Sequence, residues 1–389
     1  MDENTNIGPV SMEDSRIERA RKREKKKKKF NIIKIILIVV LVGVVAFFSY
    51  KAYLYIIRNK DTSNENISYT AAAQSKAGYF KNFLVTTTID GVKIINQNGE
   101  DVLGEICAAV SSYVKGMNEP VFVTNNKIML IYDIRGKSAI LFSDNGIIKT
   151  FNFENDIIKA KMSLTGQFVF ITKDAAMKAA VKLYNADGNE LMTWFSGTGY
   201  VVDAQISDVK SSMAVLLNEV IDSRISSKIL FFTFDNPEPY MGKVLGETVA
   251  NYVSFFGESS YIVCENCLFF IDSEGNLNKI SDFGKNQLKY FHSFKNGNIM
   301  LCFNTEGEQY NISVYNKNGK ETGNFMIDSF MSVSDTSDNE FLVLKRKSIL
   351  SVNSKGKIMR ELDCAFDVKN ACYYKDKIAV FSPDTILIY

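Results

Sequence analysis

The stretch KIMLIYDIRGKSAILFSDNGIIKTFNF, residues 127–153, consists of three runs of apolar, β-branched and aromatic residues separated by short polar breaks. Such runs favour strands of a pleated sheet that is buried on at least one face. The second break is SDNG at 143–146, in which Asp and Asn bond to their own backbone and Gly adopts a positive φ at no steric cost. The stretch therefore predicts consecutive antiparallel strands, and the turn sets the register of the strands beside it.

The same turn recurs along most of the chain. Each copy has an apolar strand end, then Asn, Asp or Ser, two further residues and a Gly: INQNG ending at Gly99, FSDNG at Gly146, YNADG at Gly188, IDSEG at Gly275, YNKNG at Gly319 and VNSKG at Gly356. The copies lie about 40 to 45 residues apart, and TFDNPEP at 233–239 stands where a degenerate copy is due. Units of four short strands at this period are typical of β-propeller blades, which stack because one blade cannot bury both its faces.

We therefore expect an all-β fold, a propeller of four-stranded antiparallel blades. First strands are predicted to begin near Val110, Ile157, Val201, Val249, Leu288, Phe330 and Phe366, with one earlier unit before them. The last unit lacks a fourth strand, which residues 67–74 can supply to close the ring. Eight blades are favoured, with seven as the alternative if the end units merge. An irregular β-sandwich or solenoid is the competing fold, and the regular spacing disfavours it.

An apolar segment near the N-terminus predicts a transmembrane anchor. Residues 35–50 read IILIVVLVGVVAFFSY, and a helix over 32–57 is long enough to cross a hydrocarbon core of roughly 30 Å. The apolar run is too long for a secretory signal peptide, and no small-x-small cleavage pattern follows it. Lys and Arg crowd residues 16–29, which predicts a cytoplasmic N-terminus whose basic tail contacts anionic lipid.

These features divide the chain into four parts. We expect a basic cytoplasmic tail at 1–31, a single-pass signal-anchor helix at 32–57, a linker with the ring-closing strand at 58–75, and an extracytoplasmic propeller at 76–389. The net charge is +2, and the basic surplus lies in the tail, so the outer part is mildly acidic. This distribution predicts a cell-membrane protein with its C-terminal domain outside and without a nucleic-acid partner.

The residue inventory argues against several kinds of site. His292, in YFHSF at 290–294, is the only histidine, which excludes multi-histidine metal sites. It lies on a predicted first strand and is interpreted as structural, because nothing marks a nucleophile and an orienting acid beside it. Glycine-rich nucleotide loops and the twelve-residue oxygen pattern of calcium loops are missing from the sequence. We expect no catalytic residue, metal or cofactor to be recognisable here.

Two of the six cysteines have the spacing of a redox motif. Cys264 and Cys267 flank Glu265-Asn266 between two strand runs, whereas thioredoxin-type motifs open a helix whose N-terminus lowers the thiol pKa. An oxidoreductase is therefore not expected. A disulfide across the hairpin and a pair of free thiols both remain open, and the other four cysteines fit buried positions in apolar strands.

Two resemblances accompany the repeat. The segment DGNELMTWF at 187–195 resembles the strand-closing turn of quinoprotein-type propellers, but Trp194 is the only tryptophan and the WD dipeptide of WD40-like repeats is missing. This supports the architecture and no quinone cofactor. With FLVTTTIDGVKIINQNGE and KLYNADGNEL, the chain is similar to a family of Gram-positive bacterial proteins known as a domain of unknown function. The resemblance implies a basic tail, one membrane helix and a propeller-like ectodomain, and it transfers no site residue.

Three functions are compatible with these features. The leading hypothesis is a non-enzymatic binding or scaffolding module at the cell envelope, with an envelope protein, peptide or glycan as partner, because propellers recognise partners through their loops. The alternative is an envelope-polymer hydrolase or lyase that uses channel-mouth carboxylates such as Asp203 or Asp367. Signalling through the basic tail is a third hypothesis, and it requires a cytoplasmic partner.

Overall fold

The computed structural model describes residues 65–68, 76–81, 83–88, 90–96, 100–294, 296–305, 309–336, 340–374, 377–382 and 385–389. The predicted tail and anchor helix, residues 1–57, lie outside these ranges, as do residues 69–75 of the linker. Within the described ranges, no helix combines the length and the apolar character that a membrane span requires.

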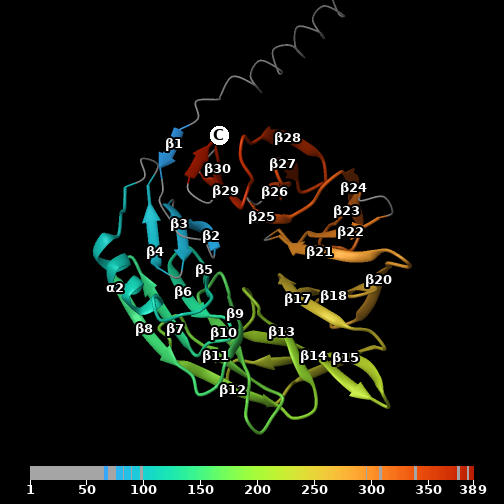
Figure 1. Cartoon of the computed structure of the whole chain (residues 1–389). Coiled ribbons are helices and arrows are strands. Elements are labelled where there is room, and N and C mark those ends of the chain that lie inside the picture. Colours follow the sequence, from blue (N-terminus) through green and yellow to red (C-terminus); the bar gives the residue numbers. More distant parts are fainter. Residues whose placement is uncertain are drawn as a thin grey trace, which may run out of the picture. The chain divides into compact units, whose positions relative to one another are not determined.

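The described residues from 65 onward form an all-β propeller whose antiparallel sheets follow one another in chain order around a ring (Figure 1). Seven of the sheets described have four strands, and one, β2-β3-β4, has three. In the four-stranded sheets the strand nearest the axis comes first in the sequence, except that the last sheet takes its fourth strand, β1, from the N-terminal side. The sequence favoured eight four-stranded blades; the structure has seven, together with the shorter sheet.

The strand bounds follow sheet by sheet: β2 (Lys76–Phe80), β3 (Phe83–Thr88), β4 (Gly91–Ile95); β5 (Pro120–Thr124), β6 (Ile128–Asp133), β7 (Ser138–Ser143), β8 (Gly146–Asn152); β9 (Ile157–Met162), β10 (Phe168–Thr172), β11 (Ala179–Tyr184), β12 (Glu190–Ser196); β13 (Tyr200–Ile206), β14 (Ser212–Ile221), β15 (Arg224–Thr233), β16 (Met241–Gly246). The remaining sheets are β17 (Ala250–Phe256), β18 (Ser259–Cys264), β19 (Cys267–Ile271), β20 (Leu277–Asp282); β21 (Gln287–Ser293), β22 (Ile299–Asn304), β23 (Tyr310–Tyr315), β24 (Glu321–Ile327); β25 (Ser332–Thr336), β26 (Glu340–Leu344), β27 (Ser348–Asn353), β28 (Ile358–Asp363); and β29 (Asn370–Tyr374), β30 (Lys377–Phe381), β31 (Thr385–Ile388), β1 (Glu65–Ser68).

The recurring turn joins the third strand of a sheet to the fourth. In YNADG, between β11 and β12, the Asn185 side-chain oxygen accepts the N–H groups of Asp187 at 3.1 Å and Asn189 at 2.8 Å, and Gly188 has a φ of 78°. The same side-chain bonding recurs at Asp272, and the degenerate copy at 233–239 lies between β15 and β16. The turns therefore have the backbone chemistry that the sequence predicts.

Buried apolar clusters lie between successive sheets and make the ring continuous. One cluster occupies each junction between neighbouring sheets. At the closing junction, Leu84 and Ile95 of the three-stranded sheet pack with Phe381 and Ile386 of the last sheet. Strand β1 pairs antiparallel with β31, so one sheet combines the first described strand of the chain with the last.

A helix takes the place of the fourth strand in the three-stranded sheet. The prediction of a first strand near Val110 is wrong, because Val110 lies in α2 (Gly104–Val114). Cys107, Val110 and Val114 are spaced along one helical face and are buried against the sheet. The Ser111 hydroxyl accepts from the Val92 N–H at 2.9 Å and donates to the Val92 carbonyl at 3.2 Å, so α2 satisfies the Val92 backbone groups that a fourth strand would otherwise pair.

Candidate functional site

Asp203, one of the two candidate channel carboxylates, is an inter-sheet ion-pair centre. It lies on β13, is fully buried, and forms ion pairs with Lys159 at 2.7 Å and Lys161 at 2.6 Å, both on β9. It also accepts the N–H of Val253 on β17 at 3.0 Å. Burial lowers the pKa of Lys161, and the Asp203 carboxylate opposes that shift. Asp203 thus joins three successive sheets, which is a structural role.

Further polar contacts extend from this ion-pair centre to β17 and β21, the first strands of the next two sheets. The Lys161 ammonium lies 3.9 Å from the ring centroid of Tyr252, and the Tyr252 hydroxyl lies 2.8 Å from that of Ser293 on β21. The other candidate, Asp367, lies between β28 and β29 and pairs with Arg346 at 3.1 Å, where both side chains are well exposed. The structure does not bring the two carboxylates into one site.

His292 lies on a first strand, β21, as the sequence indicates. Burial lowers its pKa to about 4, so the imidazole is neutral at pH 7. Its ring packs against Phe294 with centroids 5.2 Å apart. Among the side chains that the structure describes, no group of three or more His, Cys, Asp and Glu residues is arranged to hold a metal ion.

The two cysteines of redox spacing flank the hairpin between β18 and β19. Cys264 ends one strand, Cys267 begins the next, and both are buried as free thiols, like the other four cysteines. A hydrogen bond between the two thiols raises the pKa of Cys264 and lowers that of Cys267. Their disulfide stays a prediction.

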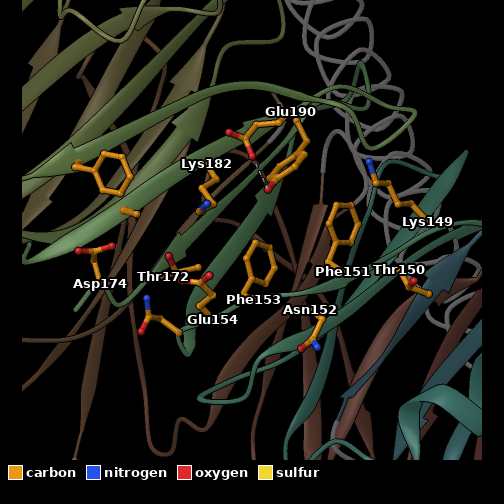
Figure 2. Close-up of a pocket in the computed structure, with 14 residues that line it drawn as sticks. Lys149, Thr150, Phe151, Asn152, Phe153, Glu154, Thr172, Asp174, Lys182 and Glu190 are labelled. Carbon is orange, nitrogen blue, oxygen red and sulfur yellow. Dashed lines mark hydrogen bonds between the residues drawn. The ribbon is translucent and has the colours of Figure 1, made fainter. Parts of the chain in front are cut away.

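A groove of about 520 Å³ lies between two neighbouring sheets. We call it the interblade groove; it is bounded by residues 149–155, which comprise the end of β8 and the turn after it, and by residues of β10, β11 and β12. In Figure 2, Lys182 and Glu190 lie above Phe153, and Asn152 and Glu154 lie below it.

Aromatic rings line the groove. Phe151 and Phe153 lie two residues apart at the end of β8 and just beyond it, with parallel rings whose centroids are 6.1 Å apart. Phe153 packs on Phe170 at 4.8 Å, and Phe151 packs on Tyr184 at 5.3 Å, which fixes both rings against the core. Phe195 on β12 is 49% exposed. The groove therefore offers a rigid aromatic wall and one open ring.

Polar groups surround the rings. Lys149 donates to the Gly188 carbonyl at 2.8 Å, and the Tyr184 hydroxyl donates to Glu190 at 3.2 Å. Burial raises the pKa of Tyr184. Several other polar side chains of the lining make no hydrogen bond or ion pair with any residue that the structure describes; among them are Asn152, Glu154, Thr172 and Lys182. The groove thus holds neutral, anionic and cationic side chains whose hydrogen-bonding groups are available to a ligand.

The sequence did not single out these residues. One signal was available, because Phe151 and Phe153 alternate in FNF and so share one strand face. Alternation does not show which neighbouring sheet that face meets. Tyr184 and Phe195 come from the next repeat, and only the ring geometry places them across the groove.

Comparisons with known proteins place the fold and the family. No curated protein matches the chain. Among solved structures, it is similar to Sqt1 of Saccharomyces cerevisiae, with 12% identity and a TM-score of 0.55 over 84% of this chain and 99% of that one. It is also similar to the computationally designed protein Ika8, with 13% identity and a TM-score of 0.57 over 83% and 98%. At such identities the likeness concerns the fold alone. The model of a family of unknown function, DUF5711, matches residues 56–388, and the chain therefore belongs to that family.

Proposed function

We propose that this chain is a membrane-anchored propeller that serves as a binding or scaffolding module at the outer face of the cell membrane. The interblade groove carries the binding part of the proposal, because its unengaged polar groups surround a rigid aromatic wall. Ligand pockets commonly combine an apolar lining with a few converging polar groups in roughly 300 to 1,000 Å³. The groove matches this description in volume, and its aromatic rings stand among a larger number of polar and charged side chains.

The envelope part of the proposal rests on the sequence. Residues 32–57 are apolar over the length of a membrane span, and the basic run at 16–29 favours a cytoplasmic N-terminus with anionic lipid beside it. The propeller would then face outward, where an envelope protein or glycan is the available partner. The alternative of a hydrolase or lyase with channel-mouth carboxylates has less support, because Asp203 is held by two lysines and Asp367 by Arg346.

Affinity capture from membranes tests the binding module. The full-length chain, tagged at its C-terminus and cross-linked in intact cells, is expected to retain a specific envelope component. Phe195→Ala in the groove is expected to lose that component, whereas Val244→Ala, which also shortens an exposed apolar side chain but lies on β16, is expected to keep it. Equal recovery by wild type and both variants would contradict a role for the groove.

Protease treatment of intact protoplasts tests the topology. The proposal predicts that the C-terminal tag is removed while an N-terminal tag is protected, because the basic run retains the N-terminus inside. Protection of both tags would place the propeller inside the cell and would remove the envelope part of the proposal.

A further inference from the structure

We propose that the interblade groove binds an uncharged oligosaccharide. The inference rests on the proposed function, because it assumes a binding module, and it adds the chemical class of the ligand. A sugar ring presents an apolar face of C–H groups and a rim of hydroxyls, each of which both donates and accepts hydrogen bonds. A complementary site therefore needs an aromatic surface next to polar groups of both kinds.

The aromatic requirement is met by Phe195 together with the wall of Phe151 and Phe153. Phe195 projects from β12 with 49% of its surface exposed, and it makes no ring contact with another aromatic side chain among the described residues. Its ring is therefore available to a ligand. The rings of Phe151 and Phe153 are parallel, and Phe153 packs on Phe170, so these rings need not reorganise on binding.

The polar requirement is met by the side chains without partners. Thr172 lines the groove and makes no hydrogen bond with a described residue, so its hydroxyl can both donate to a ligand and accept from it. Asn152 supplies an amide that donates and accepts, Glu154 a carboxylate that accepts, and Lys182 an ammonium that donates. Such a mixture suits a ring of hydroxyls better than a ligand with a single sign of charge.

Charge and edge geometry disfavour two other ligand classes. The lining has two lysines against three carboxylates, those of Glu154, Asp174 and Glu190, so a polyanion gains no net attraction. An extended peptide would bind by pairing with a strand edge. Helix α2 engages β8 at the groove, because the Tyr113 hydroxyl donates to the Phe151 carbonyl at 3.0 Å. That contact removes an acceptor which an added strand would use.

Calorimetric titration of the purified full-length chain tests the proposal. The probes are the β-1,4-linked tetramers of glucose and of N-acetylglucosamine, with an uncharged extended octapeptide as the competing class. We expect at least one tetramer to bind and the peptide not to bind. Phe195→Ala is expected to weaken binding about tenfold and Thr172→Val about fivefold, as the loss of a stacking surface and of one hydrogen bond implies.

The matched control is Ser260→Ala. Ser260 carries a buried hydroxyl without a partner and lies on β18, outside the groove, so its loss is expected to leave the Kd unchanged. Thermal unfolding of each variant separates lost binding from lost folding, because a variant that loses binding but keeps the wild-type unfolding temperature is still folded. Sedimentation with insoluble cell wall, compared with the free tetramers, distinguishes a polymeric source from a soluble saccharide.

Three results would overturn the inference: no heat with either tetramer and no sedimentation with the wall, a Kd that Phe195→Ala and Thr172→Val leave unchanged, or peptide binding that these variants abolish. If the tetramers fail while affinity capture still yields a partner that requires Phe195, the glycan inference falls and the binding module stands.

Discussion

Lowering the pH from 7 to 5 is expected to destabilise the propeller through a single residue. His292 is the only histidine of the chain, and burial lowers its pKa from 6.5 to about 4. The folded protein therefore keeps His292 neutral at pH 5, whereas the unfolded chain protonates it. Since the unfolded state binds more protons in this window, stability falls as the pH falls from about 6.5 toward 4.

The magnitude follows from the two pKa values. One pKa unit corresponds to about 1.4 kcal/mol, and pH 5 lies about 1.5 units below the unfolded pKa. The free energy of unfolding is therefore expected to drop by up to about 2 kcal/mol between pH 7 and pH 5. Carboxylates with lowered pKa values, such as Asp144 and Asp328, contribute only at lower pH, because their unfolded pKa is 3.8.

Urea denaturation of the full-length chain at pH 7, 6 and 5 measures this loss. His292→Gln removes the titration and keeps a polar, neutral side chain, so its free energy of unfolding is expected to vary little over the same range. A wild-type slope that persists unchanged in His292→Gln would refute the assignment. A wild-type protein equally stable at pH 7 and pH 5 would refute the lowered pKa of His292 itself.

Three further predictions concern the ring, α2 and the hairpin. Asp203→Asn removes the buried carboxylate that pairs with the partly exposed Lys159 and Lys161, and it is expected to cost about 3 to 5 kcal/mol of unfolding free energy, read by urea denaturation; a loss below about 1 kcal/mol would contradict the ion-pair centre. Gly91→Ala places a Cβ against the Ser111 hydroxyl at a φ of 140°, which is strained for any residue with a side chain. Amide hydrogen exchange is therefore expected to accelerate more in α2 than in the four-stranded sheets, and equal acceleration everywhere would contradict this role of Gly91. Mild oxidation is expected to join Cys264 to Cys267, as a loss of two hydrogens in the tryptic mass; a mass unchanged under oxidation that modifies other thiols would count against the pair.

The blades could be predicted because their turns depend on local chemistry. Features that depend on contacts between distant segments could not be predicted. The Asn185 turn works through bonds within five residues, so a single repeat unit carries all the information it needs. Helix α2 is different, because its sequence holds β-branched and aromatic residues that also suit a strand, and packing on the sheet decides between them. Only the folded ring shows that Ser111 bonds to the Val92 backbone on the edge of β4.

The same limit explains Asp203 and the interblade groove. A carboxylate on a first strand looks like a channel residue in the sequence, and nothing there reveals that both Lys159 and Lys161 point at it from the previous sheet. The groove combines Phe151 with Phe195, which belong to different repeats. Periodicity assigns each residue to a face of its own strand, whereas contacts between sheets depend on how the ring is assembled.

The pairing of β1 with β31 has a consequence for biosynthesis. Glu65 pairs with Ile388 and Ser68 pairs with Thr385, so the first strand of the described chain can pair only after the last one has been synthesised. During translation every intermediate sheet can form while the circle stays open, and β1 remains without its partner until the ribosome has released the final strand. A nascent chain that ends before residue 385 would lack β31, so β1 would stay unpaired and exposed to quality-control proteases.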